Sequence, residues 1–110
     1  MEIRLKNVKV YEVPDGGVAF DASLYIDGAR VGDTRNRGDG GASVVYVRDG
    51  EGRYNARLVA DMETEAATHT WSYAGETYKH NLDSYIGDLL DEVLQERAIK
   101  RKRKSSGRKG

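Results

Sequence analysis

The chain has 110 residues, of which 38% are hydrophobic and 33% are charged, and it contains no cysteine. This length allows one domain with one modest core, and the lack of thiols excludes a disulfide framework, a thiolate metal site and a thiol nucleophile. The formal net charge of zero combines two unequal parts, because residues 1–99 carry eleven basic and eighteen acidic side chains, whereas residues 100–110 carry seven basic and no acidic ones. A block of like charges cannot bury a core. We therefore expect a single domain over residues 1–99 and a basic C-terminal tail over residues 100–110.

The N-terminus alternates charged and apolar residues, which is unlike the apolar run of a secretion signal. The longest aliphatic stretch, residues 44–47, is far too short to span a membrane. We expect a cytoplasmic protein that does not contact membranes.

The first predicted element is a strand. Residues 2–13 alternate apolar and polar side chains, with a change of phase near Asn7 that predicts a β-bulge. A turn is predicted at residues 14–17, where one proline is followed by aspartate and two glycines.

The second predicted element opens a hairpin. Residues 18–26 alternate completely between apolar and polar positions. The dipeptide Asp27-Gly28 accepts the positive φ angles of a type I′ turn, so residues 29–35 are expected to return beside the preceding strand. A short β-like run follows at residues 44–47.

The middle of the chain allows two interpretations. Between residues 53 and 66, alternating apolar side chains suit a strand, whereas apolar side chains at four-residue spacing suit a helix. The length of the segment and its methionine and glutamate content favour the helix. Residues 70–79 place aromatic and β-branched residues on both sides of Ala74-Gly75, which predicts a small hairpin.

A long helix is predicted to begin after Asn81, a good N-cap residue, and to run over residues 82–99 or beyond. Its apolar stripe ends at Leu94, so its last turns are expected to project from the domain. Gly87 costs about 1 kcal/mol relative to alanine inside a helix, and close packing against the sheet is one reason to tolerate it. The predicted fold is α+β, an antiparallel sheet with N-terminal hairpins packed against a middle helix and a long C-terminal helix.

Four segments carry a resemblance to a known family: LKNVKV at residues 5–10, FDASLYIDGARVGDTRNRGDGG at 20–41, ARLVADMETEA at 56–66 and DSYIGDLLDEVLQERAIKR at 83–101. Together they resemble a family of small uncharacterised proteins from tailed phages and prophages, which share a YIDG hairpin, a glycine-rich loop, a middle helix and a late Gly-Asp-Leu helix. The resemblance favours the helix over the strand between residues 53 and 66, and it implies a phage accessory role and, if the protein is phage-encoded, the host cell cytoplasm as its location. It carries over no settled activity.

The tail is the first candidate site. Basic side chains after a helix can lie along a phosphate backbone, in contacts that depend on salt and carry no sequence preference. The candidate polyanion-binding residues are Lys100, Arg101, Lys102, Arg103, Lys104, Arg108 and Lys109. The alternative is a solubilising terminus.

A glycine-rich loop is the second candidate. Its glycines let backbone amides approach an anion, and its arginines can grip phosphate in a bidentate manner. The candidate anion loop consists of Arg35, Asn36, Arg37, Gly38, Gly40 and Gly41. It matches neither the P-loop pattern nor the dinucleotide-binding fingerprint, so a flexible hairpin exit is the favoured interpretation.

Aromatic side chains near the late hairpin form the third candidate. They could stack on bases or anchor a protein interface, although core packing explains them equally well. The candidate interface aromatics are Trp71, Tyr73, Tyr78 and Tyr85.

Catalytic and metal-binding patterns are scarce. His69 and His80 lack a metal-binding spacing, and surface or hairpin-end histidines are the favoured interpretation. The acidic residues between 61 and 65 are expected to form a solvated helix face rather than a cation site. We expect no enzyme activity, no metal and no cofactor.

The leading hypothesis is a non-enzymatic phage-type accessory protein that binds nucleic acid or another polyanion, including an acidic protein surface, through its basic tail. A rival hypothesis is an inhibitor of a host protein, an anti-defence or host-takeover factor that uses its acidic body or its aromatic patch. A weaker alternative is a nucleotide-sequestering protein that uses the glycine loop, and a homo-oligomer stays open.

Overall fold

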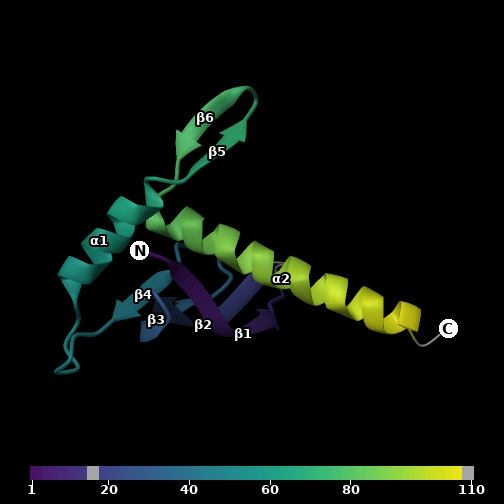
Figure 1. Ribbon diagram of the computed structural model, residues 1–110, viewed down its shortest axis with the longest axis horizontal. Helices are drawn as coiled ribbons and strands as arrows, with labels where there is room; N and C mark the ends of the chain where they lie inside the picture. The colour runs from purple at the N-terminus through teal and green to yellow at the C-terminus, as the bar shows by residue number, and fades with distance from the viewer. Residues whose placement is uncertain (15–17, 108–110) are drawn as a thin grey trace.

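The computed structural model describes residues 1–14 and 18–107, and side chains through residue 102 in the last helix. The fold is α+β, as predicted, with strands and helices in the order seen in Figure 1. The elements are β1 (Ile3–Glu12), β2 (Val18–Ile26), β3 (Ala29–Asn36), β4 (Val44–Val47), α1 (Ala56–Ala66), β5 (Thr70–Tyr73), β6 (Glu76–Lys79) and α2 (Leu82–Gly107).

The first four strands form one antiparallel sheet in chain order, β1-β2-β3-β4. The predicted bulge is confirmed, because the pairing of β1 with β2 shifts between Lys6 and Lys9 and Asn7 has a φ of +54°. The predicted type I′ turn is also confirmed, with φ angles of +49° at Asp27 and +84° at Gly28. The turn predicted at residues 14–17 lies largely outside the described residues.

One face of the sheet, here called the inner face, carries the core. α2 crosses this face on the β1 side and α1 lies on the β4 side (Figure 1). The core is assembled from the inward positions of the strands and one stripe of each helix, because alternation along β1 and β2 puts every second side chain on the same face. Its buried members are Ile3, Leu5, Val8, Phe20, Ala22, Leu24, Val47, Met62, Leu82, Ile86 and Leu90.

The segment that allowed two interpretations is a helix, α1. The Oδ1 atom of Asn55 accepts the backbone amide of Leu58 at 3.0 Å and caps the helix. Met62 and Ala66, on its inner stripe, are fully buried. The hairpin predicted over residues 70–79 is β5-β6, and it extends away from the four-stranded sheet (Figure 1) with every residue of both strands exposed.

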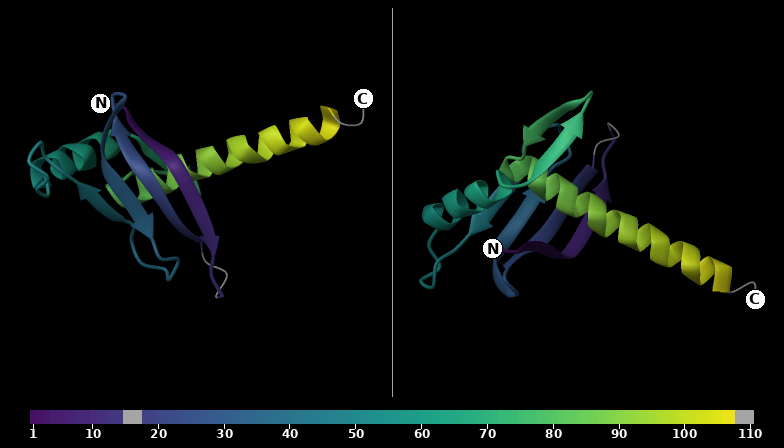
Figure 2. Two further views of the ribbon diagram at one scale, coloured as in Figure 1. Left: turned by 90° about the horizontal axis from the view of Figure 1, so that it is seen from below. Right: turned by 45° about the horizontal axis from the view of Figure 1, so that its top comes forward.

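α2 begins after Asn81, whose Oδ1 atom accepts the amide of Ser84 at 2.8 Å, and it continues to Gly107. The Nη2 atom of Arg97 donates to the carbonyl oxygen of Val8 at 2.7 Å, so the helix contacts β1 one turn beyond its apolar stripe. After this contact α2 projects past β1 (Figure 2). Gly87 corrects one expectation, because a Cβ atom there would meet nothing within 4 Å and close packing does not explain it.

Neither α1 nor α2, over the residues described, combines the length and hydropathy that a membrane crossing needs.

Candidate nucleic-acid interface

The basic end of α2 is the first candidate surface. Lys100, Arg101 and Lys102 are exposed and helical, and none of them forms an ion pair with a described carboxylate. The backbone of these three residues is helical and continues α2, so it does not form an irregular tail. The side chains of Arg103 and Lys104, and the whole of Arg108 and Lys109, lie outside the described residues.

In the glycine-rich loop that follows β3, two backbone amides donate hydrogen bonds to nearby side chains. The amide of Gly38 donates to Asn36 Oδ1 at 2.7 Å, and the amide of Gly41 donates to Asp39 Oδ1 at 3.0 Å. The Nδ2 atom of Asn36 in turn donates to the Gly41 carbonyl oxygen at 3.0 Å. An anion in this loop would need these two backbone amides as hydrogen-bond donors, but side-chain oxygens already accept both of them. One of these oxygens belongs to the carboxylate of Asp39. Arg35 and Arg37 are exposed on either side of Asn36.

The four candidate aromatic residues separate into two groups. Trp71 and Tyr78 stack across the β5-β6 hairpin with ring centroids 4.7 Å apart, and Tyr73 lies at its tip. These three residues, Trp71, Tyr78 and Tyr73, are 42%, 38% and 70% exposed. Tyr85, in contrast, lies half-buried in α2 and stacks on His69 at 4.5 Å. Core packing therefore accounts for Tyr85 but not for the three hairpin aromatics.

His80 lies at the end of the hairpin, as expected, but it is buried rather than on the surface, at 5% exposure. Its Nδ1 atom is 2.9 Å from Ser84 Oγ and its Nε2 atom is 3.0 Å from Asp88 Oδ2. Ser84 Oγ also accepts the Asn81 amide at 3.1 Å, so this hydroxyl belongs to the first turn of α2. These contacts join the end of the hairpin to the first turns of α2.

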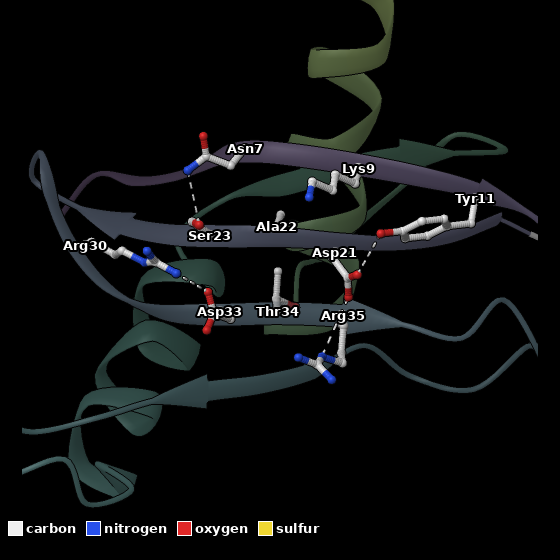
Figure 3. Close-up of a pocket in the computed structure, with 10 residues that line it drawn as sticks. All are labelled: Asn7, Lys9, Tyr11, Asp21, Ala22, Ser23, Arg30, Asp33, Thr34 and Arg35. Atoms are coloured by element: carbon white, nitrogen blue, oxygen red, sulfur yellow. Dashed lines mark hydrogen bonds and ion pairs between the residues drawn. The ribbon is translucent and has the colours of Figure 1, made fainter.

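The sequence patterns did not point to a further surface, the face of the four-stranded sheet opposite the helices, here called the outer face. Figure 3 shows the side chains around its open hollow of about 400 Å³. They are supplied by the polar positions of β1, β2 and β3. The residues around the hollow include Asn7, Lys9, Tyr11, Asp21, Ser23, Arg30, Asp33 and Arg35.

Hydrogen bonds and ion pairs order the outer face. Arg30 Nη2 is 2.8 Å from Asp33 Oδ1, and Arg35 Nε is 3.7 Å from Asp21 Oδ1. Tyr11 donates its hydroxyl to Asp21 Oδ2 at 3.2 Å. This hydrogen bond raises the pKa of Tyr11 above its ordinary value, because it stabilises the protonated phenol next to a negative charge.

Cations also lie over aromatic rings on the outer face. Lys6 Nζ is 4.4 Å from the ring centroid of Tyr25, and Arg35 Cζ is 5.9 Å from that of Tyr46 on β4. The alternation of the strands is the sequence signal that could have located this face, since Lys6, Lys9 and Tyr11 occupy its outward positions in β1.

Among the residues that the structure describes, no group of three histidine or acidic side chains could hold a metal ion. Comparisons of the chain with protein-family models, with curated proteins and with solved structures give no match.

Proposed function

We propose that this protein is a non-enzymatic accessory protein that binds nucleic acid through the basic end of α2. The observation that supports the proposal most directly is the position of Lys100, Arg101 and Lys102, which are exposed on a helix that has already passed the edge of the sheet. Phosphate oxygens are the ligands that such a series of cations favours.

Charge distribution supports the same surface. The rest of the chain, residues 1–99, has an excess of seven acidic side chains over basic ones, and this body repels a polyanion. A duplex is therefore expected to lie along the projecting part of α2 rather than on the acidic surfaces of the body.

The cellular setting is part of the proposal. The resemblance to tailed-phage and prophage proteins is the ground for proposing a phage accessory role in the host cytoplasm. The binding proposal depends on the charges of α2 and not on that setting.

The test is a titration of duplex DNA with the full-length protein at several salt concentrations between about 50 and 200 mM. The variant replaces the five basic residues 100–104 by glutamine, which keeps the helical length. We expect it to bind more weakly and to lower the slope of log affinity against log salt by about one for each phosphate that it no longer neutralises. A matched control neutralises Arg48, Arg53 and Arg57, which are exposed near β4 and α1. If both variants bind like the wild type, or if the wild type does not bind, the proposal is wrong.

A second candidate function has one specific observation in its favour. The hairpin presents Trp71, Tyr73 and Tyr78 to solvent, and aromatic side chains of this kind anchor protein interfaces. An inhibitor of a host protein would use this surface. Under that hypothesis, the wild type retains a defined protein from nuclease-treated bacterial lysate, and a variant with both Trp71→Ala and Tyr73→Ala does not. Equal recovery by both proteins would reject it.

A further inference from the structure

We infer that the outer face of the sheet is a second nucleic-acid surface, one that binds the unpaired bases of a single strand held by the basic end of α2. The inference deepens the proposed function and rests on it. Its occupant is single-stranded nucleic acid, because the outer face combines exposed aromatic rings with uncompensated positive charge.

The charge of the outer face is opposite to that of the body. Arg30 and Arg35 are paired with Asp33 and Asp21. Lys6 and Lys9, on β1, are exposed and form no ion pair with a described carboxylate. Two cations are thus left over on this face, while residues 1–99 as a whole have more acidic than basic side chains. A phosphate backbone is attracted here and repelled from the acidic surfaces around it.

Tyrosine rings interleave with these cations. Tyr11 and Tyr46 are each 47% exposed, and Tyr25 is half-buried beneath Lys6. Tyr11 lies on β1 and Tyr46 on β4, so exposed rings lie on both edge strands of the sheet. An aromatic ring or an arginine plane on an open sheet offers a stacking partner to any base. Duplex bases already stack on one another, so this face favours a strand whose bases are unpaired.

The two surfaces are continuous at β1. Arg97 of α2 is bound to the carbonyl oxygen of Val8, and the next residue, Lys9, lines the hollow on the opposite face (Figure 3). α2 leaves the sheet past this same strand (Figure 2). A single-stranded nucleic acid bound to residues 100–102 therefore needs to cross only β1 to reach Lys9 and Tyr11.

The experiment compares a short single-stranded oligonucleotide with the duplex of the same sequence, each as DNA and as RNA. We expect the wild type to prefer the single strand. Replacing Tyr11 and Tyr46 by leucine should lower single-strand affinity at least about five-fold, the lower limit for loss of one stacked base, and leave duplex affinity and the salt slope unchanged. The DNA and RNA arms show which sugar is preferred.

Matched variants separate stacking from other effects. Tyr11→Phe and Tyr46→Phe keep the rings and should retain single-strand affinity, although the first loses the hydrogen bond to Asp21. Tyr73→Leu removes an exposed tyrosine of the hairpin, outside both proposed nucleic-acid surfaces, and should leave the single-strand and duplex affinities unchanged. If the leucine variant does not fold, Lys9→Glu gives the same test, because it reverses an exposed charge and should weaken single-strand binding more than duplex binding.

The two proposals fail in different ways. If the wild type binds single strand and duplex equally, or if the leucine and Lys9→Glu variants keep full single-strand affinity, the inference about the outer face is overturned. The proposed function still stands in that case, provided that neutralising residues 100–104 weakens duplex binding. If neutralisation has no effect while the leucine variant loses single-strand affinity, the proposed role of α2 is wrong instead.

Discussion

Among the glycines that the structure describes, Gly32 has the least room for a side chain. It lies in β3 between Leu24 of β2 and Val47 of β4. A Cβ atom at this position would lie 1.8 Å from the carbonyl oxygen of Tyr46. Any side chain here must push β4 away from β3, which also displaces a tyrosine of the outer face.

We predict that Gly32→Ala lowers the free energy of unfolding by about 1–3 kcal/mol, the cost typical of an overpacked site. Equilibrium urea denaturation measures this change. Since the clash is with backbone atoms, no rotamer change relieves it. An unchanged urea midpoint would contradict the prediction.

Gly87 provides the matched control for this glycine. It lies inside α2, and an added Cβ atom meets nothing within 4 Å. Gly87→Ala should therefore raise the free energy of unfolding by about 1 kcal/mol, the difference in helix propensity. The sequence alone does not distinguish the two glycines, because the atom that excludes a side chain from Gly32 comes from a strand that begins twelve residues later.

At the scale of elements, α2 has two parts with different roles. Up to Leu94 its apolar stripe packs on the sheet, and Leu82, Ile86 and Leu90 are buried there. Arg97 then donates to the carbonyl oxygen of Val8, a residue in the bulge of β1. The sequence pattern predicted the end of the apolar stripe correctly, but it could not predict this polar contact across 89 residues.

We predict that Arg97→Ala destabilises the protein by about 1 kcal/mol or somewhat more, because the variant lacks a hydrogen bond from a charged donor and leaves the carbonyl of Val8 without its partner. Arg101→Ala, one turn further along α2, is the control and should leave stability within about 0.5 kcal/mol of the wild type. Thermal unfolding measures both variants. Equal effects of the two substitutions would show that the hydrogen bond to Val8 contributes nothing.

The strands and helices themselves were largely predictable. Strict alternation in residues 18–26, followed by Asp27-Gly28, leaves little choice but a hairpin, and the structure confirms it. Residues 53–66 were ambiguous, because side chains four residues apart lie on the same face both in a helix and in a strand. Burial of Met62 against the sheet decides for the helix. No local pattern indicates that β5-β6 forms a sheet of its own, because this depends on how the other strands and helices pack together.

At the scale of the whole molecule, the fold raises the pKa of three tyrosines that lie in three different regions. Hydrogen bonds to carboxylates raise the pKa of Tyr11 on the sheet, by way of Asp21, and of Tyr78 on the hairpin, by way of Glu76. Burial raises the pKa of Tyr85 in α2. The ordinary value for each is 10.0.

Since the folded pKa values are above the unfolded ones, the unfolded chain loses these protons first as pH rises. The stability that these groups contribute is complete below about pH 10 and is lost as the pH passes through the folded values. We expect the native protein to form tyrosinate, followed by its ultraviolet absorbance, at higher pH than the urea-unfolded chain. Tyr85→Phe should reduce the gap between the two titration curves. Coincident curves would contradict the prediction.

The candidate surfaces differ in how much of them could be predicted. The basic end of α2 is visible in composition alone, because its cations are consecutive in the chain. The outer face is not, since Lys6, Lys9, Tyr25 and Tyr46 come from three strands and become neighbours only when the pairing register is set. Arg35 and Asn36 of the candidate anion loop lie in β3, and its glycines follow that strand. No sequence rule indicated that Asn36 and Asp39 would bind the loop amides.

The β5-β6 hairpin gives the protein a natural point of attachment for foreign sequence. Its turn at Ala74-Gly75 lies at the far tip of an element that contributes no residue to the buried core and lines neither of the two proposed nucleic-acid surfaces. A fluorescent tag or a purification peptide inserted there extends an existing protrusion. Such an insertion leaves both chain ends unaltered, so a labelled protein can report on α2 and on the sheet at once.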